Sequence, residues 1–407
     1  WGSIFTFRGG RFFWKWPTLG PRRVSIWFGE ALDQPENIFQ VRDAVQQLGA
    51  AAVTDRKQRA MVLPRLMIRK CKKAKFRWKI ADSTGQAISG AMLLMRALIL
   101  RRLLLREVFP ANDSNGNGKY VGVLLPPTNG AVIVNAACTL AGRVACNLNY
   151  TVSADVMNRC IAKAGIKHVL TSKKVIDKLQ MDIDAELVLL EDFREKVTLA
   201  DKLVGGFMAY AAPAGMVDWS LGLNQLTGDD ELTVIFTSGS TGDPKGVVLT
   251  MHNIGSNVDA IDQVVHLRPE DTVLGIVPFF HSLGFTVTLW TILGLDVRCA
   301  YHFSPLEAKQ VGKLARDREA SVLLATPTFL RNYLRRCEPA DFEKLDIAVA
   351  GAEKLPIPLC EAFEAKFGVR PVEGYGTTES SPLVSVNVPK SRSQGNQLDC
   401  KEGTVGR

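Results

Sequence analysis

The chain has 407 residues, of which 46% are hydrophobic and 22% are charged, and its formal net charge is +9. This length and apolar content allow about two or three domains with a large core, and they exclude a disordered tail, a disulfide-stapled miniprotein and a collagen-like repeat. The eight cysteines form no C-x-x-C pair, which argues against a structural metal site or a redox dithiol and favours a reducing compartment.

The positive charge lies mostly at the front of the chain. Residues 1–110 carry a strong excess of Lys and Arg, whereas the remainder is mildly acidic. This asymmetry predicts two modules with different partners. The chain begins at Trp1 without a visible signal or transit peptide and ends at Arg407, directly after a Gly-x-x-Gly. We therefore expect a fragment that is cut at both ends.

Residues 1–52 contain short β-like runs and then one helical segment at 37–52. This is too little to bury a core, so we interpret it as the tail of a domain. Residues 53–79 follow as a basic linker with interleaved apolar side chains. Two interpretations of this linker stay open: a solvated connection, or a segment on an anionic membrane, where each Lys or Arg contributes about 1 kcal/mol. Nucleic-acid binding is disfavoured because no known binding fold accompanies the charge.

From residue 80 to residue 407 short apolar runs alternate with helical stretches. The runs that predict buried strands are 120–127, 167–172, 186–192, 232–238, 271–280, 296–301, 320–327, 345–352 and 370–376. This alternation predicts an α/β fold with mostly parallel sheets covered by helices, and ligands at the carboxyl ends of the strands. The segment 91–109 is interrupted by arginines, so it predicts an amphipathic helix and not a membrane span.

The strongest chemical signal is a polar loop between two apolar runs. A buried strand at 232–236 leads into a segment of small polar residues, followed by a second apolar run that ends at 250. The segment supplies hydroxyls, flexible glycines and one cation: Thr237, Ser238, Gly239, Ser240, Thr241, Gly242, Lys245 and Gly246. Glycines let backbone N–H groups approach an anion closely, so the pattern predicts a polyphosphate cradle. It is not the Walker pattern, because no Ser or Thr follows Lys245.

This loop matches the signature of the adenylate-forming (AMP-binding) enzymes, which include acyl-CoA synthetases, peptide-synthetase adenylation domains and luciferases. Further stretches resemble motifs of that family in the expected order: 121–149, PFFHSLGF at 278–285, AGAEKL at 350–355 and GYGTTE at 374–379. The resemblance covers roughly residues 80–407. It implies the large N-terminal domain of the adenylate-forming fold, without the family's C-terminal lid.

The resemblance also implies roles for individual residues in an ATP site. Residues 237–246 are expected to hold the β- and γ-phosphates, with Lys245 as their counter-charge. Tyr375 is expected to stack on the adenine, Thr378 to bind the α-phosphate, and Glu379 to ligate Mg²⁺. The other expected members of the ATP site are Gly351, Ala352, Glu353, Gly376 and Thr377.

On the acyl side, the resemblance implies that His281 gates a hydrophobic pocket and completes a catalytic set with Lys245, Thr378 and Glu379. The aromatic residues around it, Phe279, Phe280, Phe285 and Trp290, suit either an acyl tunnel or an ordinary core. The implied reaction is the ATP-dependent activation of a fatty acid to an acyl adenylate. The acyl group then passes to the phosphopantetheine thiol of acyl carrier protein or coenzyme A. A non-catalytic ATP-binding remnant is the remaining alternative.

The front of the chain resembles the C-terminal end of glycerolipid acyltransferase domains. The chain runs from this acyltransferase-like tail through the linker to the adenylation core. This order is similar to that of bacterial bifunctional proteins of phospholipid acyl recycling. This similarity implies a location at the cytoplasmic face of the bacterial inner membrane. The acyltransferase pattern H-x-x-x-x-D occurs at His266 and Asp271, but inside the adenylation core, so we interpret it as chance.

Overall fold

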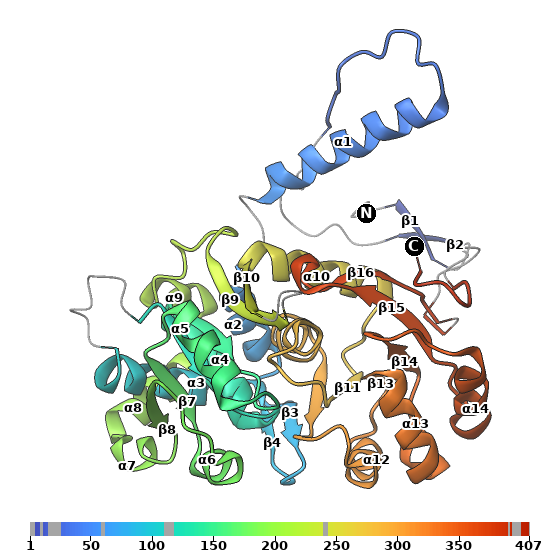
Figure 1. Ribbon diagram of the computed structural model, residues 1–407. Coiled ribbons are helices and arrows are strands. Elements are labelled where there is room, and N and C mark those ends of the chain that lie inside the picture. The colour runs from blue at the N-terminus through green and yellow to red at the C-terminus, as the bar shows by residue number, and fades with distance from the viewer. Residues whose placement is uncertain are drawn as a thin grey trace. The chain divides into compact units, whose positions relative to one another are not determined.

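The computed structural model describes residues 5–8, 11–14, 26–57, 62–109, 118–238, 243–389, 391–392 and 400–406. The chain divides into a small unit, Trp1–Ala60 with Gln394–Gln397, and a large unit, Met61–Ser393 with Leu398–Arg407. The small unit contains an antiparallel pair, β1 (Phe5–Arg8) and β2 (Arg11–Trp14), and one long helix, α1 (Ile38–Lys57) (Figure 1). These elements form where the sequence predicts strands and a helix.

A six-stranded sheet forms the first layer of the large unit, in the order β10-β9-β6-β5-β7-β8. Its strands are β5 (Tyr120–Val123), β6 (Val144–Asn147), β7 (His168–Thr171), β8 (Glu186–Leu189), β9 (Glu231–Ser238) and β10 (Pro244–Thr250). Neighbouring strands are parallel from β9 to β8, and only the edge strand β10 runs antiparallel to its neighbour. The edge pair β9–β10 therefore carries the polar loop at its turn.

An eight-stranded sheet forms the second layer, in the order β16-β15-β14-β13-β11-β12-β3-β4. Its strands are β3 (Trp78–Asp82), β4 (Ala87–Ser89), β11 (Thr272–Gly275), β12 (Arg298–Tyr301), β13 (Val322–Ala325), β14 (Ile347–Ala350), β15 (Val372–Gly376) and β16 (Leu383–Val386). The strands from β15 to β3 are parallel, and each edge is closed by an antiparallel strand. The carboxyl ends of β11, β13, β14 and β15 consequently meet at one edge of this sheet.

Helices cover these sheets, so the predicted α/β architecture is confirmed. They are α2 (Leu63–Lys73), α3 (Gly90–Glu107), α4 (Asn129–Leu140), α5 (Ala154–Ala164), α6 (Lys173–Leu179), α7 (Phe193–Lys196), α8 (Leu199–Tyr210), α9 (Ala214–Ser220), α10 (Met251–Val265), α11 (Thr291–Gly294), α12 (Ala308–Asp317), α13 (Pro327–Arg336) and α14 (Ile357–Phe367). Figure 1 shows α12, α13 and α14 together beside β13 and β14. Several helices begin at a Ser or Thr whose side chain accepts a backbone N–H bond, as Thr128 does for α4.

The predicted strand runs all contain strands, but β8 is an edge strand that is exposed or half-buried, and not buried as predicted. The segment 91–109 forms helix α3, whose inner side is part of the core. Among the described residues, no helix combines the length and the apolar character needed to cross a membrane. His266 ends α10 in a left-handed conformation, and Asp271 is buried in an ion pair with Arg392. Both residues of this H-x-x-x-x-D string therefore have roles in the fold of the large unit.

The segment 53–79 is not a linker throughout, and this part of the sequence-based prediction is wrong. Residues 63–73 form helix α2, and residues 78 and 79 begin β3. The apolar residues Leu63, Met67 and Ile68, which we considered as membrane contacts, are almost completely buried in the core of the large unit. Leu63, Met67 and Ile68 are spaced as residues on one face of a helix. The charged residues between them make this helical pattern hard to recognise in the sequence. The core therefore begins near residue 62, and not at residue 80.

The basic side chains of this segment bind to the protein itself. Arg65 and Arg69 of α2 form ion pairs with the buried carboxylate of Asp218, at 3.1 and 2.6 Å. Lys79 of β3 is buried, and its ammonium donates to the carbonyl oxygens of Leu295 and Val297 at 2.5 and 3.1 Å. These ion pairs and hydrogen bonds of basic side chains thus fix α2 and β3 to the rest of the large unit.

Candidate active site

The polar loop joins the antiparallel strands β9 and β10. In their register Thr237 lies opposite Lys245, and Phe236 lies opposite Gly246. Lys245 is exposed, and within the described part of the chain its ammonium has no partner. Four expected phosphate ligands, Gly239, Ser240, Thr241 and Gly242, lie outside the described residues, and of Ser238 only the backbone position at the end of β9 is described.

The loop-bearing strand lies next to the GYGTTE motif. Strand β10 contacts the short 3-10 helix η3 (Thr378–Ser380), which carries Thr378 and Glu379. Helix α10 follows β10 directly and is tied to β16 by Asn257, whose side-chain amide donates to the Leu383 carbonyl at 2.8 Å and accepts from the Leu383 N–H at 3.3 Å. The two nucleotide motifs, more than a hundred residues apart in sequence, are thereby neighbours in the fold.

The GYGTTE motif starts in β15 and continues into η3. A Cβ atom at Gly376 would overlap the carbonyl oxygen of Pro382, so this position requires glycine. The Tyr375 side chain is 48% exposed, which leaves a ring face available for stacking. The Thr378 hydroxyl lies 3.3 Å from the Ser282 hydroxyl, and this contact joins the motif to the histidine-bearing segment.

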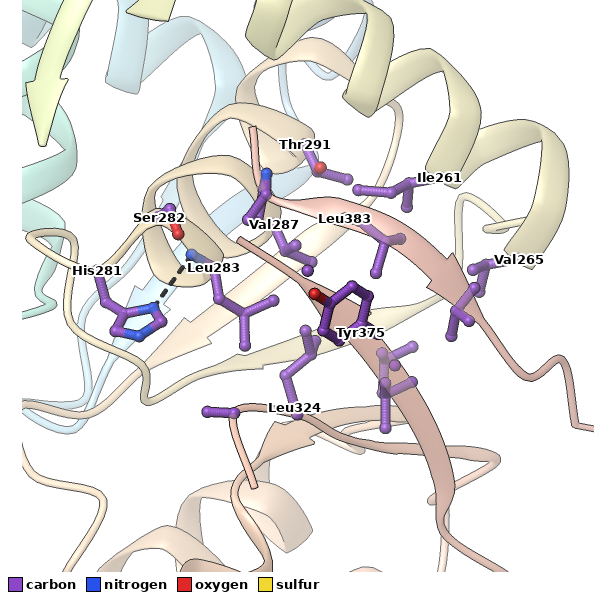
Figure 2. Close-up of a pocket in the computed structure, with 18 of the residues that line it drawn as sticks. Ile261, Val265, His281, Ser282, Leu283, Val287, Thr291, Leu324, Tyr375 and Leu383 are labelled. Carbon is purple, nitrogen blue, oxygen red and sulfur yellow. Dashed lines mark hydrogen bonds between the residues drawn. The ribbon is translucent and has the colours of Figure 1, made fainter. Parts of the chain in front are cut away.

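A cavity of about 220 Å³ lies where these motifs meet. The predicted residues that line it are His281, Gly351, Ala352, Tyr375, Gly376, Thr377 and Thr378. The rest of its lining is mainly aliphatic and includes Ile261, Val265, Val287, Leu324 and Leu383. Figure 2 shows these aliphatic side chains around the Tyr375 ring, with His281 and Ser282 at one side. The cavity thus combines a polar rim with an apolar interior, a combination suited to a ligand with a polar end and a hydrocarbon chain.

These residues lie at or after the carboxyl ends of strands, as the sheet topology predicts. His281 follows β11, Gly351 and Ala352 follow β14, and Tyr375 ends β15. Because these strands are parallel neighbours around β13, their carboxyl ends lie at the same edge. The expected gathering of ligand residues at this edge is therefore present.

His281 lies at the rim of the cavity, where its Nδ1 atom accepts a hydrogen bond from the Leu283 N–H at 3.3 Å (Figure 2). Desolvation by the surrounding residues lowers the pKa of His281 below its usual value. The imidazole is consequently neutral at physiological pH. A neutral ring at an apolar opening neither repels nor traps an incoming hydrocarbon chain.

Glu353 lines a second cavity of about 390 Å³, together with Ala352, Tyr375 and Gly376. Its carboxylate accepts a hydrogen bond from the Thr328 hydroxyl at 3.0 Å. Because the two cavities share Ala352, Tyr375 and Gly376, the predicted adenine-site residues form one continuous surface.

Other predicted residues do not line these cavities. Lys245 and Glu379 belong to elements that contact each other, β10 and η3. The aromatic residues Phe279, Phe285 and Trp290 are buried in the core and do not line this cavity, whereas Phe280 is half-buried and its ring packs edge-on against Tyr150 at 5.0 Å. Ser282 was not assigned a role from sequence, although its position next to His281 in PFFHSLGF was available as a signal.

The donor set is compatible with Mg²⁺ held mainly by phosphate. The described residues contain no preformed cluster of three or more His, Cys, Asp or Glu side chains. The Glu379 carboxylate is exposed, and no described residue pairs with it. Mg²⁺ commonly binds through one or two carboxylates plus substrate phosphates and water, and a single free carboxylate beside Thr378 fits this mode.

Comparisons with known proteins agree with this arrangement. A family model described as AMP-binding enzyme matches residues 113–407. A long-chain-fatty-acid–CoA ligase of Bacillus subtilis (strain 168) is 32% identical over 171 residues, which cover 40% of this chain and 30% of the relative. The long-chain-fatty-acid–CoA ligase FadD13 of Mycobacterium tuberculosis (strain H37Rv) is 26% identical over 272 residues, covering 65% of this chain and 50% of the relative.

Solved structures show the same fold. The inhibitor-bound N-terminal domain of FACL13 from Mycobacterium tuberculosis aligns with a TM-score of 0.65 at 20% identity, covering 81% of this chain and 79% of that one. Apo MatB from Rhodopseudomonas palustris aligns with a TM-score of 0.61 at 20% identity, covering 81% and 62%. The matches to those two ligases span 30% and 50% of the relatives' lengths. Because the AMP-binding enzyme model matches residues 113–407, which are most of this chain, the chain belongs to the AMP-binding enzyme family.

Proposed function

We propose that this chain carries the ATP and acyl sites of an enzyme that activates a fatty acid as its acyl adenylate and then forms an acyl thioester. One observation carries the proposal: the GYGTTE motif and His281 share the rim of a largely aliphatic cavity, next to the strand that bears Lys245. The names of the two fatty-acid–CoA ligases above support a fatty acid as the substrate.

In this proposal the fatty-acid carboxylate attacks the α-phosphorus of ATP, and the bond to pyrophosphate breaks. Tyr375 stacks on the adenine, Gly351, Ala352 and Glu353 border it, and Thr378 donates a hydrogen bond to the α-phosphate. Lys245 and the loop 237–246 balance the charge of the β- and γ-phosphates, and Gly376 and Thr377 shape the nucleotide surface. Glu379 holds Mg²⁺, which neutralises phosphate charge when bound. Such reactions depend mainly on positioning and charge neutralisation.

The acceptor thiol comes from outside the chain in this proposal. Burial raises the pKa of Cys138 to about 12 and that of Cys71 to about 11, so neither thiol forms the reactive thiolate at neutral pH. A phosphopantetheine thiolate attacks the acyl carbonyl, and AMP leaves. His281 acts as a neutral gate between the nucleotide rim and the aliphatic interior.

We propose acyl carrier protein as the acceptor, because residues 1–52 resemble the tail of a glycerolipid acyltransferase domain. Under this reading the protein recycles phospholipid acyl chains at the cytoplasmic face of the bacterial inner membrane. The second candidate is a long-chain fatty acid–CoA ligase, which the names of the relatives favour. Product analysis with both thiols offered to the intact protein separates the two.

The test of adenylation is fatty-acid-dependent exchange of labelled pyrophosphate into ATP, measured on the intact protein. We expect Lys245→Ala to lower exchange by roughly a hundred-fold, because it removes the one cation of the loop. Lys309→Ala is the matched control, since Lys309 is also exposed but lies on α12. Undiminished exchange in Lys245→Ala would remove Lys245 from the proposed mechanism, whereas ATP binding without any exchange in the unaltered protein would favour a non-catalytic, ATP-binding remnant.

A further inference from the structure

Helix α8 carries an apolar side that no described part of the chain covers. Its inner side holds Asp201, Gly205 and Ala209 against α3, so closely that a Cβ atom at Gly205 would lie 2.9 Å from Ile99. Its outer side exposes Leu203 and Phe207, and the only charged residues of the helix are Asp201 and Lys202. The outer side of a surface helix is normally polar, so folding of this chain alone does not explain the pattern.

Helix α9 extends this apolar surface. Lys72 of α2 donates to the carbonyl oxygens of Met208 and Ala212, both at 2.6 Å, and so fixes the junction between α8 and α9. We define the α8–α9 face by its exposed apolar side chains, Leu199, Leu203, Val204, Phe207, Met216 and Trp219. Figure 1 shows α3, α8 and α9 on the same side of the large unit. Leucine, phenylalanine and tryptophan are the residues that interfacial membrane helices present to lipid.

The surroundings of the α8–α9 face are positively charged. A cavity of about 220 Å³ between α3, α8 and the end of α9 is lined by Arg101 and Arg102. Helix α2, which contacts α9, contains Arg and Lys residues and no acidic residue. The acidic residues of α8 and α9, Asp201 and Asp218, are buried and paired with arginines. Each of these carboxylates is paired with two arginines, Asp218 with Arg65 and Arg69 and Asp201 with Arg102 and Arg106, so a positive excess remains beside the apolar side chains.

We propose that the α8–α9 face docks on an anionic phospholipid bilayer. The apolar side chains enter the boundary between head groups and acyl chains, and the excess of basic side chains on α2 and α3 attracts the lipid phosphates. Basic residues beside an aromatic and aliphatic surface are complementary to such a bilayer. A second copy of the chain is a poorer occupant, because it would bring the same positive charge against itself. Within the segment 53–79, the apolar side chains of Leu63, Met67 and Ile68 are buried, whereas Phe76 is exposed and its ring lies 6.3 Å from that of Tyr210 at the end of α8, beside the proposed face.

The test is co-sedimentation of the 407-residue chain with vesicles of phosphatidylcholine mixed with phosphatidylglycerol. We expect the double variant Leu203→Glu/Phe207→Glu to lower the partition coefficient by roughly ten-fold or more. Leu306→Glu is the matched control, because Leu306 is 64% exposed, as Leu203 is at 65%, but lies in the turn before α12. Binding of the unaltered chain should weaken at high salt and on pure phosphatidylcholine.

Three results would overturn the proposal. The unaltered chain could fail to bind the anionic vesicles, or the double variant could bind them as well as the control does. Light scattering could instead reveal a dimer that the double variant dissociates with no change in vesicle binding, which would assign the face to a second copy. The assay contains neither ATP nor a fatty acid, so its outcome is independent of adenylation. Circular dichroism checks that both variants fold, as expected for substitutions at exposed positions.

Discussion

At the scale of single residues, Gly376 leaves the least room for a Cβ atom among the described glycines. Replacing it by alanine places a Cβ atom against the Pro382 carbonyl oxygen, which is backbone and has little freedom to move away. We expect Gly376→Ala to reduce pyrophosphate exchange more than ten-fold and to lower the free energy of unfolding by about 1–3 kcal/mol. Gly215→Ala is the control, because nothing lies within 4 Å of a Cβ there. Equal behaviour of the two variants in exchange and in urea unfolding would contradict this assignment.

Thr378 permits a separate test of the proposed α-phosphate contact. Thr378→Val keeps the shape of the side chain but removes the hydroxyl, which lies 3.3 Å from that of Ser282. We expect exchange to fall by roughly ten-fold or more with little change in stability, since the residue is only half-buried. Thr378→Ser should restore most of the activity. If valine and serine variants exchange equally well, the hydroxyl has no part in the reaction.

The polar residues of the site could be predicted from sequence, but its apolar lining could not. GYGTTE and the loop are contiguous strings whose residue types are dictated by close backbone approach and phosphate charge. The aliphatic lining is collected from distant positions such as Ile261, Leu324 and Leu383, each of which looks like any core residue. Of the aromatic residues near His281, Phe279, Phe285 and Trp290 belong to the core, and sequence alone does not distinguish such residues from the lining of a pocket.

At the scale of elements, helix α2 gives the sharpest contrast between sequence and structure. If residues 63–73 were a solvated linker, truncating their apolar side chains would leave stability unchanged. Because Leu63 is fully buried, we expect Leu63→Ala to lower the free energy of unfolding by about 2–5 kcal/mol. Phe76→Ala, at an exposed position just after α2, should cost far less. Denaturant titration of the large-unit transition measures both, and similar small losses would restore the linker interpretation.

Strand β3 makes a further prediction through Lys79. Desolvation lowers the pKa of this lysine to about 8, whereas in the unfolded chain it titrates near its ordinary value of about 10.4. Between these values the unfolded state binds more protons, so this lysine makes the free energy of unfolding rise with pH. Relative to Lys79→Met, we expect the unaltered chain to gain about 1.4 kcal/mol between pH 7 and pH 9. Equal pH dependence of the two proteins would contradict this expectation.

Strand prediction succeeded where continuous apolar runs fill the parallel interior of a sheet. It missed the short, partly buried edge strands β4 and β16, and also the buried strands β3 and β6 inside the sheets. Helix α8 was also missed, because its apolar outer side and two glycines gave no amphipathic pattern. These elements depend on tertiary structure, which the local sequence does not show. For the strands it is the position in the sheet, and for α8 it is the surface that the fold leaves uncovered.

At the scale of the whole molecule, the proposed ATP site is contributed by two sheets. Lys245 belongs to the six-stranded sheet, whereas Tyr375 and Glu379 follow the outer part of the eight-stranded sheet. A nucleotide that contacts both must stabilise their mutual packing, and at about a hundred times its dissociation constant it adds about 2.7 kcal/mol to the free energy of unfolding.

We therefore expect ATP with Mg²⁺ to slow amide hydrogen exchange in β10 and around Tyr375 together. Lys245→Ala should weaken the protection in both places, because the two elements share one ligand. Helix α12, which lines neither cavity, serves as the internal control and should exchange at an unchanged rate. Protection around Tyr375 with none in β10 would mean that the nucleotide is held by the eight-stranded sheet alone. The loop after β9 would then have a purpose other than binding phosphate.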